Sequence, residues 1–206
     1  MFNLKASVVS VSFLALTAAA QASTNLVADG SFSEGSGVGS YSTTFAGGNI
    51  GAWNVTSGSV DLIGSYWAAP TGYSIDLDGN SPGAISQDLS LATGGYLLTF
   101  SLAGNPDGGS AVKSVEVAID GVTHDFTFDT TGQARNNMGW LTESVYFSNT
   151  AATTTLSFTS KDAGGPYGAA LADISVTAVP EPGSTALMLA GLGMVGVMAS
   201  RRKRGV

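Results

Sequence analysis

The chain has 206 residues, no cysteine, one histidine and a formal net charge of −7 at pH 7. The lack of cysteine excludes disulfides and thiol catalysis, and a single histidine argues against a zinc centre. The acidic balance repels phosphate backbones, so we expect no nucleic-acid partner. Charged residues make up only 11% of the chain and there are 28 glycines, a profile typical of short strands joined by tight turns.

Residues 1–22 have the pattern of a secretory signal peptide. Lys5 precedes an apolar stretch from Ala6 to Ala20, and Ala20-Gln21-Ala22 fits an A-x-A cleavage site that ends at Ala22. The sequence therefore predicts export of the chain.

Residues 179–206 form a second end segment with its own pattern. An uncharged apolar run from Thr185 to Ser200 predicts a transmembrane helix over about 185–200, ~24 Å long against a hydrocarbon core of ~30 Å. The basic cluster at 201–204 predicts a stop on the cytoplasmic side, and hence a tether to the inner membrane. In order, the segment has Pro180, Glu181 and Pro182, the apolar run, and then Arg201, Arg202, Lys203 and Arg204.

This order of proline step, apolar run and basic cluster resembles the PEP-CTERM sorting signal of Gram-negative bacteria. The resemblance implies recognition by an exosortase-type membrane protease. It also implies transfer to the cell surface or to an extracellular polysaccharide matrix. An ordinary C-terminal membrane anchor is the alternative.

Residues 23–178 are long enough for one domain with a real core. Apolar residues recur there with a period of two rather than 3.6, as at Tyr96, Leu98 and Phe100, which predicts an all-β fold. Asp120-Gly121 between two such runs predicts a two-residue hairpin turn. Short strands spaced by turn residues favour a jelly-roll β-sandwich.

Short segments spread in order over this domain carry a second resemblance. They include Asn25-Leu26-Val27, Gly30-Ser31-Phe32, Trp53-Asn54-Val55, Gly58 to Ile63, Gly79 to Gly83, and Gly168 to Leu171 with Asp173. Together they resemble the choice-of-anchor C domain, which is related to a plant cell-wall domain of unknown function and to galactose-binding-like modules. The resemblance implies a galactose-binding-like β-sandwich with a tendency to bind polysaccharide.

Two patterns of catalytic type are better explained as turns. Gly79 to Gly83 fits G-x-S-x-G, but Pro82 follows the serine and has no N–H for an oxyanion hole. Asp76 and Asp78 lie ~6.6 Å apart along a strand, a spacing that a glycosidase pair could use. Turn chemistry accounts for them equally well, since Asp bonds its own backbone in tight turns. We therefore predict that the protein is not an enzyme, and a glycoside hydrolase is the less favoured alternative.

Three acidic residues are candidate ligands of a structural Ca²⁺. Asp29, Glu34 and Asp173 come from the two ends of the domain, which meet on neighbouring strands in galactose-binding-like sandwiches. Hard oxygen ligands of this kind suit Ca²⁺. Solvated surface acids are the alternative.

Sugar recognition needs exposed aromatic faces and a few polar groups. Aromatic residues in Gly-, Ala- or Pro-rich loops are candidates for this role, whereas Trp53 at a strand start is expected in the core. The candidate carbohydrate-binding residues are Tyr66, Trp67, Trp140 and Tyr167 with the polar partners Asn105 and Asp107, and Tyr66 and Trp67 are expected to carry most of the affinity.

The sequence thus predicts an exported protein of the cell surface or extracellular matrix that binds polysaccharide without converting it. The competing hypothesis is a structural, cohesive protein of the biofilm matrix that has no defined ligand. Sandwich architecture alone does not decide between them.

Overall fold

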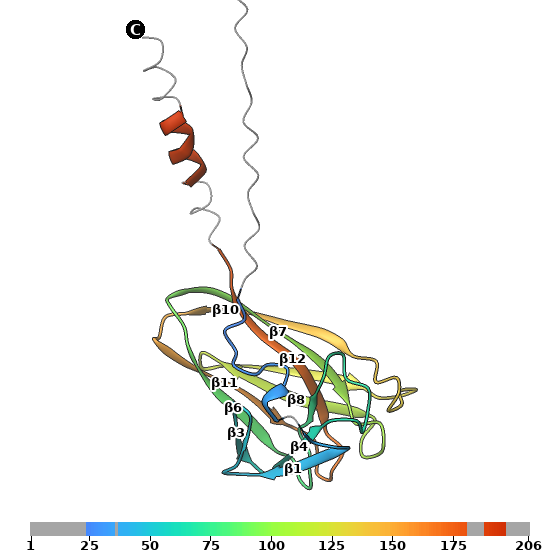
Figure 1. Cartoon of the computed structure of the whole chain (residues 1–206). Helices are drawn as coiled ribbons and strands as arrows, with labels where there is room; N and C mark the ends of the chain where they lie inside the picture. The colour runs from blue at the N-terminus through green and yellow to red at the C-terminus, as the bar shows by residue number, and fades with distance from the viewer. Residues whose placement is uncertain (1–23, 36, 181–187, 197–206) are drawn as a thin grey trace, which may run out of the picture.

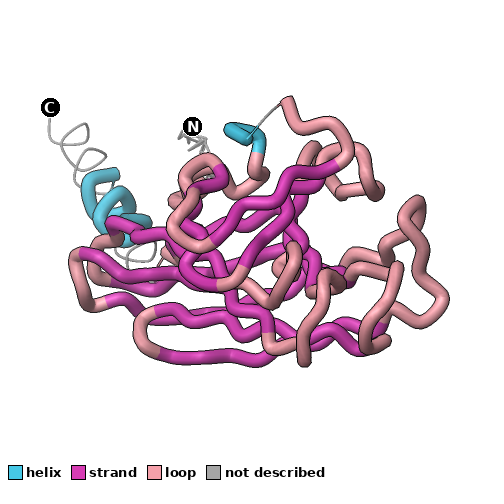
Figure 2. The backbone as a smooth tube through the Cα atoms, turned by 90° about the horizontal axis from the view of Figure 1, so that it is seen from below, coloured by secondary structure: helices cyan, strands magenta, loops and turns pink. Residues whose placement is uncertain are grey.

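The computed structural model describes residues 24–35, 37–180 and 188–196. Its strands pack as two antiparallel six-stranded sheets, face to face (Figures 1 and 2). The first sheet has the order β1 (Tyr41–Phe45), β4 (Ser59–Ile63), β5 (Ser74–Asp76), β12 (Ala169–Ala178), β7 (Gly94–Gly104) and β10 (Leu141–Asn149). The second has the order β2 (Asn49–Ile50), β3 (Trp53–Ser57), β6 (Ala84–Ser90), β11 (Thr153–Ser160), β8 (Val112–Ile119) and β9 (Val122–Asp129). The predicted all-β sandwich is confirmed.

The core lies between the two sheets and is built by residues that alternate along the strands. In β7 the side chains of Tyr96, Leu98, Phe100 and Leu102 are buried, while the three residues between them are half-exposed. Trp53 is fully buried, as predicted, between the rings of Phe32 and Phe158. Within the described residues, every buried hydrophobic side chain lies between Val27 and Val176, so the segment 24–180 contains its own core.

The predicted hairpin at Asp120-Gly121 is confirmed. It joins β8 to β9, and both residues have positive φ, 50° and 73°. A two-residue turn of this kind matches the twist of the strands only with φ above zero at both positions.

The first residues of the domain lie alongside its last strand. The Leu26 N–H donates to the Val176 carbonyl and the Ile174 N–H to the Gly30 carbonyl, each at 2.9 Å. The Asn25 side chain bonds the backbone of Ile174 and Val176. The expectation that the two ends of the domain meet is thus confirmed, and both ends leave the sandwich on the side opposite β1 (Figure 1).

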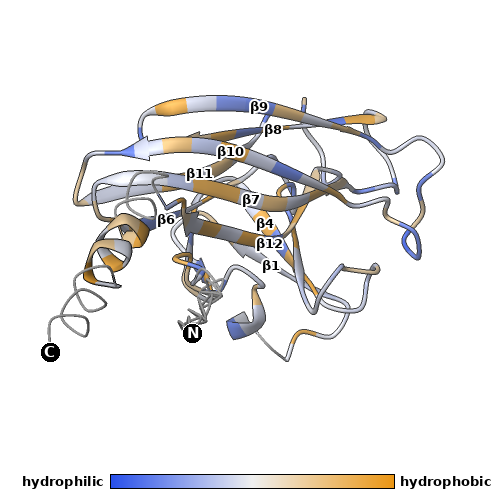
Figure 3. Ribbon diagram, turned by 90° about the horizontal axis from the view of Figure 1, so that it is seen from above, coloured by the Kyte–Doolittle hydropathy of each residue, from blue (hydrophilic) through white to orange (hydrophobic). Residues whose placement is uncertain are grey.

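The predicted end segments are described only in part. Residues 1–22, Glu181, Pro182 and the basic cluster at 201–204 lie outside the described residues. Of the helix expected over 185–200, residues 188–196 are described, and they are helical, exposed and mostly hydrophobic (Figure 3). In the described ranges, no helix has both the length and the apolarity to span a membrane. The transmembrane helix stays a prediction.

Candidate functional site

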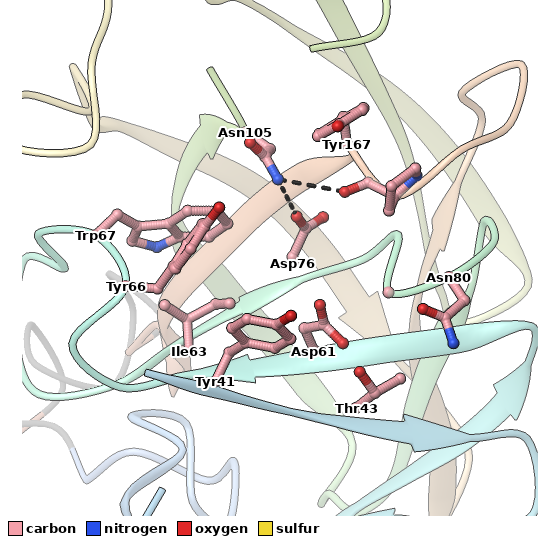
Figure 4. Close-up of a pocket in the computed structure, with 12 residues that line it drawn as sticks. Tyr41, Thr43, Asp61, Ile63, Tyr66, Trp67, Asp76, Asn80, Asn105 and Tyr167 are labelled. Carbon is pink, nitrogen blue, oxygen red and sulfur yellow. Dashed lines mark hydrogen bonds between the residues drawn. The ribbon is translucent and has the colours of Figure 1, made fainter. Parts of the chain in front are cut away.

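A pocket of about 300 Å³ opens on the first sheet, where β1, β4 and β5 meet the loops that follow β4 and β7 and the loop that precedes β12 (Figure 4). Its sheet side is formed by Tyr41 and Thr43 of β1, Asp61 of β4 and Asp76 of β5. This volume is at the lower end of the range usual for small-ligand sites, about 300–1,000 Å³.

The structure brings together most of the residues that the sequence singled out for sugar binding. Tyr66, Trp67, Asn105 and Tyr167 all line the pocket. Asp107 lies at its rim, where it accepts a hydrogen bond from the Tyr66 hydroxyl at 2.9 Å. The remaining candidate, Trp140, donates its Nε1–H to the carbonyl of Ala68 at 2.8 Å, and so contacts the loop that carries Tyr66 and Trp67.

The expectation that Trp67 offers an exposed face is wrong. Its side chain is only 4% exposed and belongs to the core. The loop after β4 folds back over β5, so that Trp67 Nε1 donates to the Ser74 hydroxyl at 2.8 Å, and the ring packs beside Tyr66 at 5.8 Å between centroids. Trp67 therefore supports the pocket wall.

Tyr66 is held by a group of polar and aromatic neighbours at the rim. The Arg135 guanidinium lies 4.0 Å from the centroid of its ring, and Arg135 Nη2 donates to its hydroxyl at 2.6 Å. Arg135 Nε also pairs with both carboxylate oxygens of Asp107, at 2.9 and 3.0 Å. The ring of Tyr41 meets that of Tyr66 edge-on at 5.4 Å. Arg135 thus covers part of Tyr66, while Tyr41 remains 52% exposed.

Asp76 at the back of the pocket ties three segments together. Its Oδ1 accepts the backbone N–H groups of Asp78 and Gly168, each at 3.0 Å, and its Oδ2 accepts from Asn105 Nδ2 at 2.7 Å (Figure 4). The bond to Asp78 is the turn geometry expected for this pair. Burial raises the pKa of the Asp76 carboxyl to about 8, against the opposing effect of these hydrogen bonds.

Asp78 does not join Asp76 in the pocket. It is fully buried, and burial raises its pKa to about 6. Near it lies the buried ammonium of Lys113, which donates to the carbonyls of Gly108 and Tyr167, each at 2.6 Å. Lys113 therefore fixes the two loops that carry Asp107 and Tyr167.

The G-x-S-x-G segment is the tight turn that the proline predicts. The Ser59 hydroxyl accepts the backbone N–H groups of Asn80 and Ser81 at 2.7 and 3.2 Å. Asp78 and Pro82 form an isolated bridge across the turn. The lone histidine, His124, lies half-buried on β9, outside the pocket.

Sequence reasoning missed four residues of the site: Tyr41, Asp61, Asn80 and Arg135. Asp61 is only 9% exposed, and its Oδ1 has no hydrogen-bond partner among the described residues. Burial raises the pKa of its carboxyl, and the nearby Thr43 hydroxyl opposes this.

The calcium candidates Asp29, Glu34 and Asp173 line a separate hollow of about 490 Å³ at the meeting point of the two domain ends. Asp29 Oδ1 accepts the Glu34 N–H at 3.1 Å, and Asp29 Oδ2 is buried with no partner among the described residues. Asp173 accepts a hydrogen bond from the Thr71 hydroxyl. In the described part of the chain, no three acidic or histidine side chains converge on one point. The orphaned Asp29 oxygen fits a cation ligand, but a site built from all three carboxylates does not fit.

Comparison with protein families gives two matches. Residues 25–177 match the family described as "Protein of unknown function (DUF642)". Residues 178–203 match the PEP-CTERM protein-sorting motif, which confirms the predicted sorting signal. The narrower resemblance to the choice-of-anchor C domain stays a prediction.

Individual relatives are more distant. The chain is 33% identical over 172 residues to Halomucin of Haloquadratum walsbyi, an alignment that covers 79% of this chain and 2% of that protein. The solved structure of TmCBM61 in complex with β-1,4-galactotriose is 16% identical, with a TM-score of 0.49 and coverage of 76% of this chain and 100% of that one. CBM35 from Paenibacillus barcinonensis is 17% identical, with a TM-score of 0.44 and coverage of 67% and 99%. Likenesses this low say nothing about a ligand of this chain.

Proposed function

Since the chain belongs to the DUF642 family and carries a PEP-CTERM sorting motif, we propose that it is an exported surface protein that binds carbohydrate through the pocket of β1, β4 and β5. The observation that carries the proposal is the composition of this pocket. Aromatic rings at Tyr41 and Tyr66 stand beside amides at Asn80 and Asn105 and a carboxylate at Asp61. Sugars are bound by this combination, because rings stack on their C–H faces while amides and carboxylates bond their hydroxyls.

Binding without turnover is part of the proposal. A glycosidase needs two carboxyl groups that both face the scissile bond. In this pocket Asp76 is only 1% exposed, and its two oxygens already accept three N–H donors. These bonds leave Asp76 poorly placed to act as an acid or nucleophile, which supports a binding role.

The sorting motif supports a route for the protein. An exosortase-type membrane protease recognises the C-terminal segment while an apolar helix tethers the chain to the inner membrane of a Gram-negative bacterium. The processed protein then reaches the cell surface or the extracellular polysaccharide matrix. The match over residues 178–203 is what supports this proposal.

A structural calcium ion remains a separate proposal. The buried Oδ2 of Asp29 would be a ligand, with Asp173 across the same hollow. Calcium is bound by carboxylate and carbonyl oxygens of this kind, and it would fix the two domain ends together.

The binding proposal is tested on the segment 24–180, which contains its own core. It is screened against a panel of immobilised polysaccharides, and hits are titrated by calorimetry. Tyr41→Ala is expected to weaken binding at least about fivefold, because the loss of a stacking ring typically costs over 1 kcal/mol. Tyr146→Ala is the matched control, since Tyr146 is an exposed tyrosine too, 62% against 52% for Tyr41, but lies on β10, outside the pocket.

Three results would contradict the proposal. If no polysaccharide binds saturably and the segment associates with itself, the alternative of a cohesive matrix protein would be favoured. Equal losses in the two tyrosine variants would place the site elsewhere. Release of reducing sugar would show an enzyme.

A further inference from the structure

The pocket is acidic, with no free cation to balance it. Asp61 and Asp76 line it, and none of its lining residues, all of them described, is Lys or Arg. Arg135 stands at the rim over the Tyr66 ring and is already paired with Asp107. Lys113 lies behind the loops and bonds two backbone carbonyls. Since burial raises the pKa of Asp76 to about 8, that group is largely neutral at pH 7, and an anionic ligand would meet the Asp61 carboxylate with no basic lining residue to offset it.

Asp61 is the acid with an unused binding capacity. It is 9% exposed, and its Oδ1 has no donor among the described residues. An unsatisfied buried carboxylate oxygen costs free energy, and a ligand donor that reached this oxygen past Gly79 would recover part of that cost. Figure 4 shows the Asp61 carboxylate beside Tyr41 and Thr43, on the side of the pocket that faces Asp76.

The aromatic rings complete a site for a cation. Tyr41 is half exposed and contacts Tyr66 edge-on, so its ring borders the space in front of Asp61. Aromatic faces attract ammonium groups through the ring quadrupole, and a carboxylate beside them adds a charge-assisted hydrogen bond. A neutral hydroxyl can also donate a hydrogen bond to Asp61, but it gains neither the attraction to the ring nor the charge-assisted strength of the hydrogen bond.

We propose that the pocket selects an amino sugar with a free ammonium group, as in a deacetylated hexosamine polysaccharide, with Asp61 as the ammonium acceptor and Tyr41 as the ring beside it. This inference rests on the proposed carbohydrate binding and specifies its substrate class. Uronic-acid polymers are rejected by the same acidic lining.

The test compares four soluble probes by calorimetry with the segment 24–180. They are a hexamer of β-1,4-glucosamine, the fully N-acetylated hexamer, a neutral galactan oligomer and an oligogalacturonate. The glucosamine hexamer is expected to bind at least about tenfold more tightly than its N-acetylated form, since a hydrogen bond to a charged group typically contributes that much. Its affinity is expected to fall as salt is raised, because the contact joins two charges. The oligogalacturonate is expected not to bind.

Asp61→Asn isolates the charge. The variant is expected to lose the preference for the glucosamine hexamer while its affinity for the N-acetylated hexamer changes less than about threefold. Asp88→Asn removes the same charge on β6, outside the pocket, and is expected to keep the preference. If Asp61→Asn does not fold, the selectivity and salt dependence of the unmodified protein still decide the matter.

The outcomes separate the two levels of the proposal. Equal or tighter binding of neutral or uronic-acid probes would overturn the amino-sugar inference and leave carbohydrate binding intact. Binding of trilysine as tightly as the glucosamine hexamer would show recognition of an ammonium group alone, and would also overturn it. Binding of none of the glycans would overturn both.

Discussion

The carboxyl group of Asp76 makes the stability of the sandwich depend on pH in the neutral range. Burial raises its pKa from 3.8 to about 8. Between these two pH values the Asp76 carboxyl is protonated in the folded state, whereas in the unfolded chain it is ionised. Because the folded state binds more protons in this window, the free energy of unfolding falls as pH rises from 3.8 towards 8.

The size of the effect follows from the two pKa values. The Asp76 carboxyl has a pKa of about 8 in the folded state and near 4 in the unfolded chain. This difference lowers the free energy of unfolding by about 2 kcal/mol between pH 6 and pH 8. Burial also raises the pKa of Asp78, to about 6, so most of its contribution lies below this window. A loss of ~2 kcal/mol is a large part of the 5–15 kcal/mol that usually stabilises a domain.

Urea unfolding of the segment 24–180 at pH 6, 7 and 8 measures this slope. In Asp76→Asn the carboxamide cannot titrate, so the decline between pH 6 and 8 is expected to shrink to under about 0.5 kcal/mol, whatever the variant loses at every pH. Asp88→Asn, which removes an acid from β6 outside the pocket, is expected to keep the full decline. A flat or rising profile in the unmodified protein, or a full decline in Asp76→Asn, would refute the reasoning.

Three further predictions concern packing, backbone and metal. Trp67→Ala is expected to destabilise the domain by about 3–5 kcal/mol in urea unfolding, because it empties a buried ring site, and a loss under ~1 kcal/mol would show that the ring is not core. Gly58→Ala is expected to cost about 2 kcal/mol more than Gly72→Ala. Both glycines have positive φ, but only at Gly58 would a Cβ overlap a backbone oxygen, that of Pro82. EDTA is expected to lower the melting temperature of the segment 24–180, and Asp29→Asn is expected to abolish that response; an unchanged melting temperature in EDTA would exclude the structural calcium.

The strands that sequence reasoning found are those with one face on the core. In β7 and β8 apolar and polar residues alternate, because one side packs inward and the other does not. β1 was missed because it is an edge strand, paired only with β4, and its residues Tyr41–Phe45 include none that is buried. Because this strand was not predicted, Tyr41 was not identified as a residue of the pocket.

The site shows a second limit of the sequence pattern. Alternation in β4 predicts that Val60 and Leu62 face the core and therefore that Asp61 faces outward. The loops around the pocket cover that outer face, so Asp61 is buried as well. The glycine and proline residues correctly predicted that these segments are loops. Which residues they bring together, such as Arg135 and Asp107, depends on contacts between distant segments.

β12 joins the pocket to the C-terminal segment. Gly168, just before the strand, donates to Asp76 in the pocket, and Val179, just after it, donates to the Gly95 carbonyl, some ten residues or ~33 Å away. A ligand held in the pocket and a pull on the tail would therefore load this strand along its length. Its hydrogen bonds to β5 and β7 lie across that direction, so they would have to shear together rather than unzip one by one. If the proposed tether and the proposed polymer binding both hold, this geometry resists a force applied along the strand.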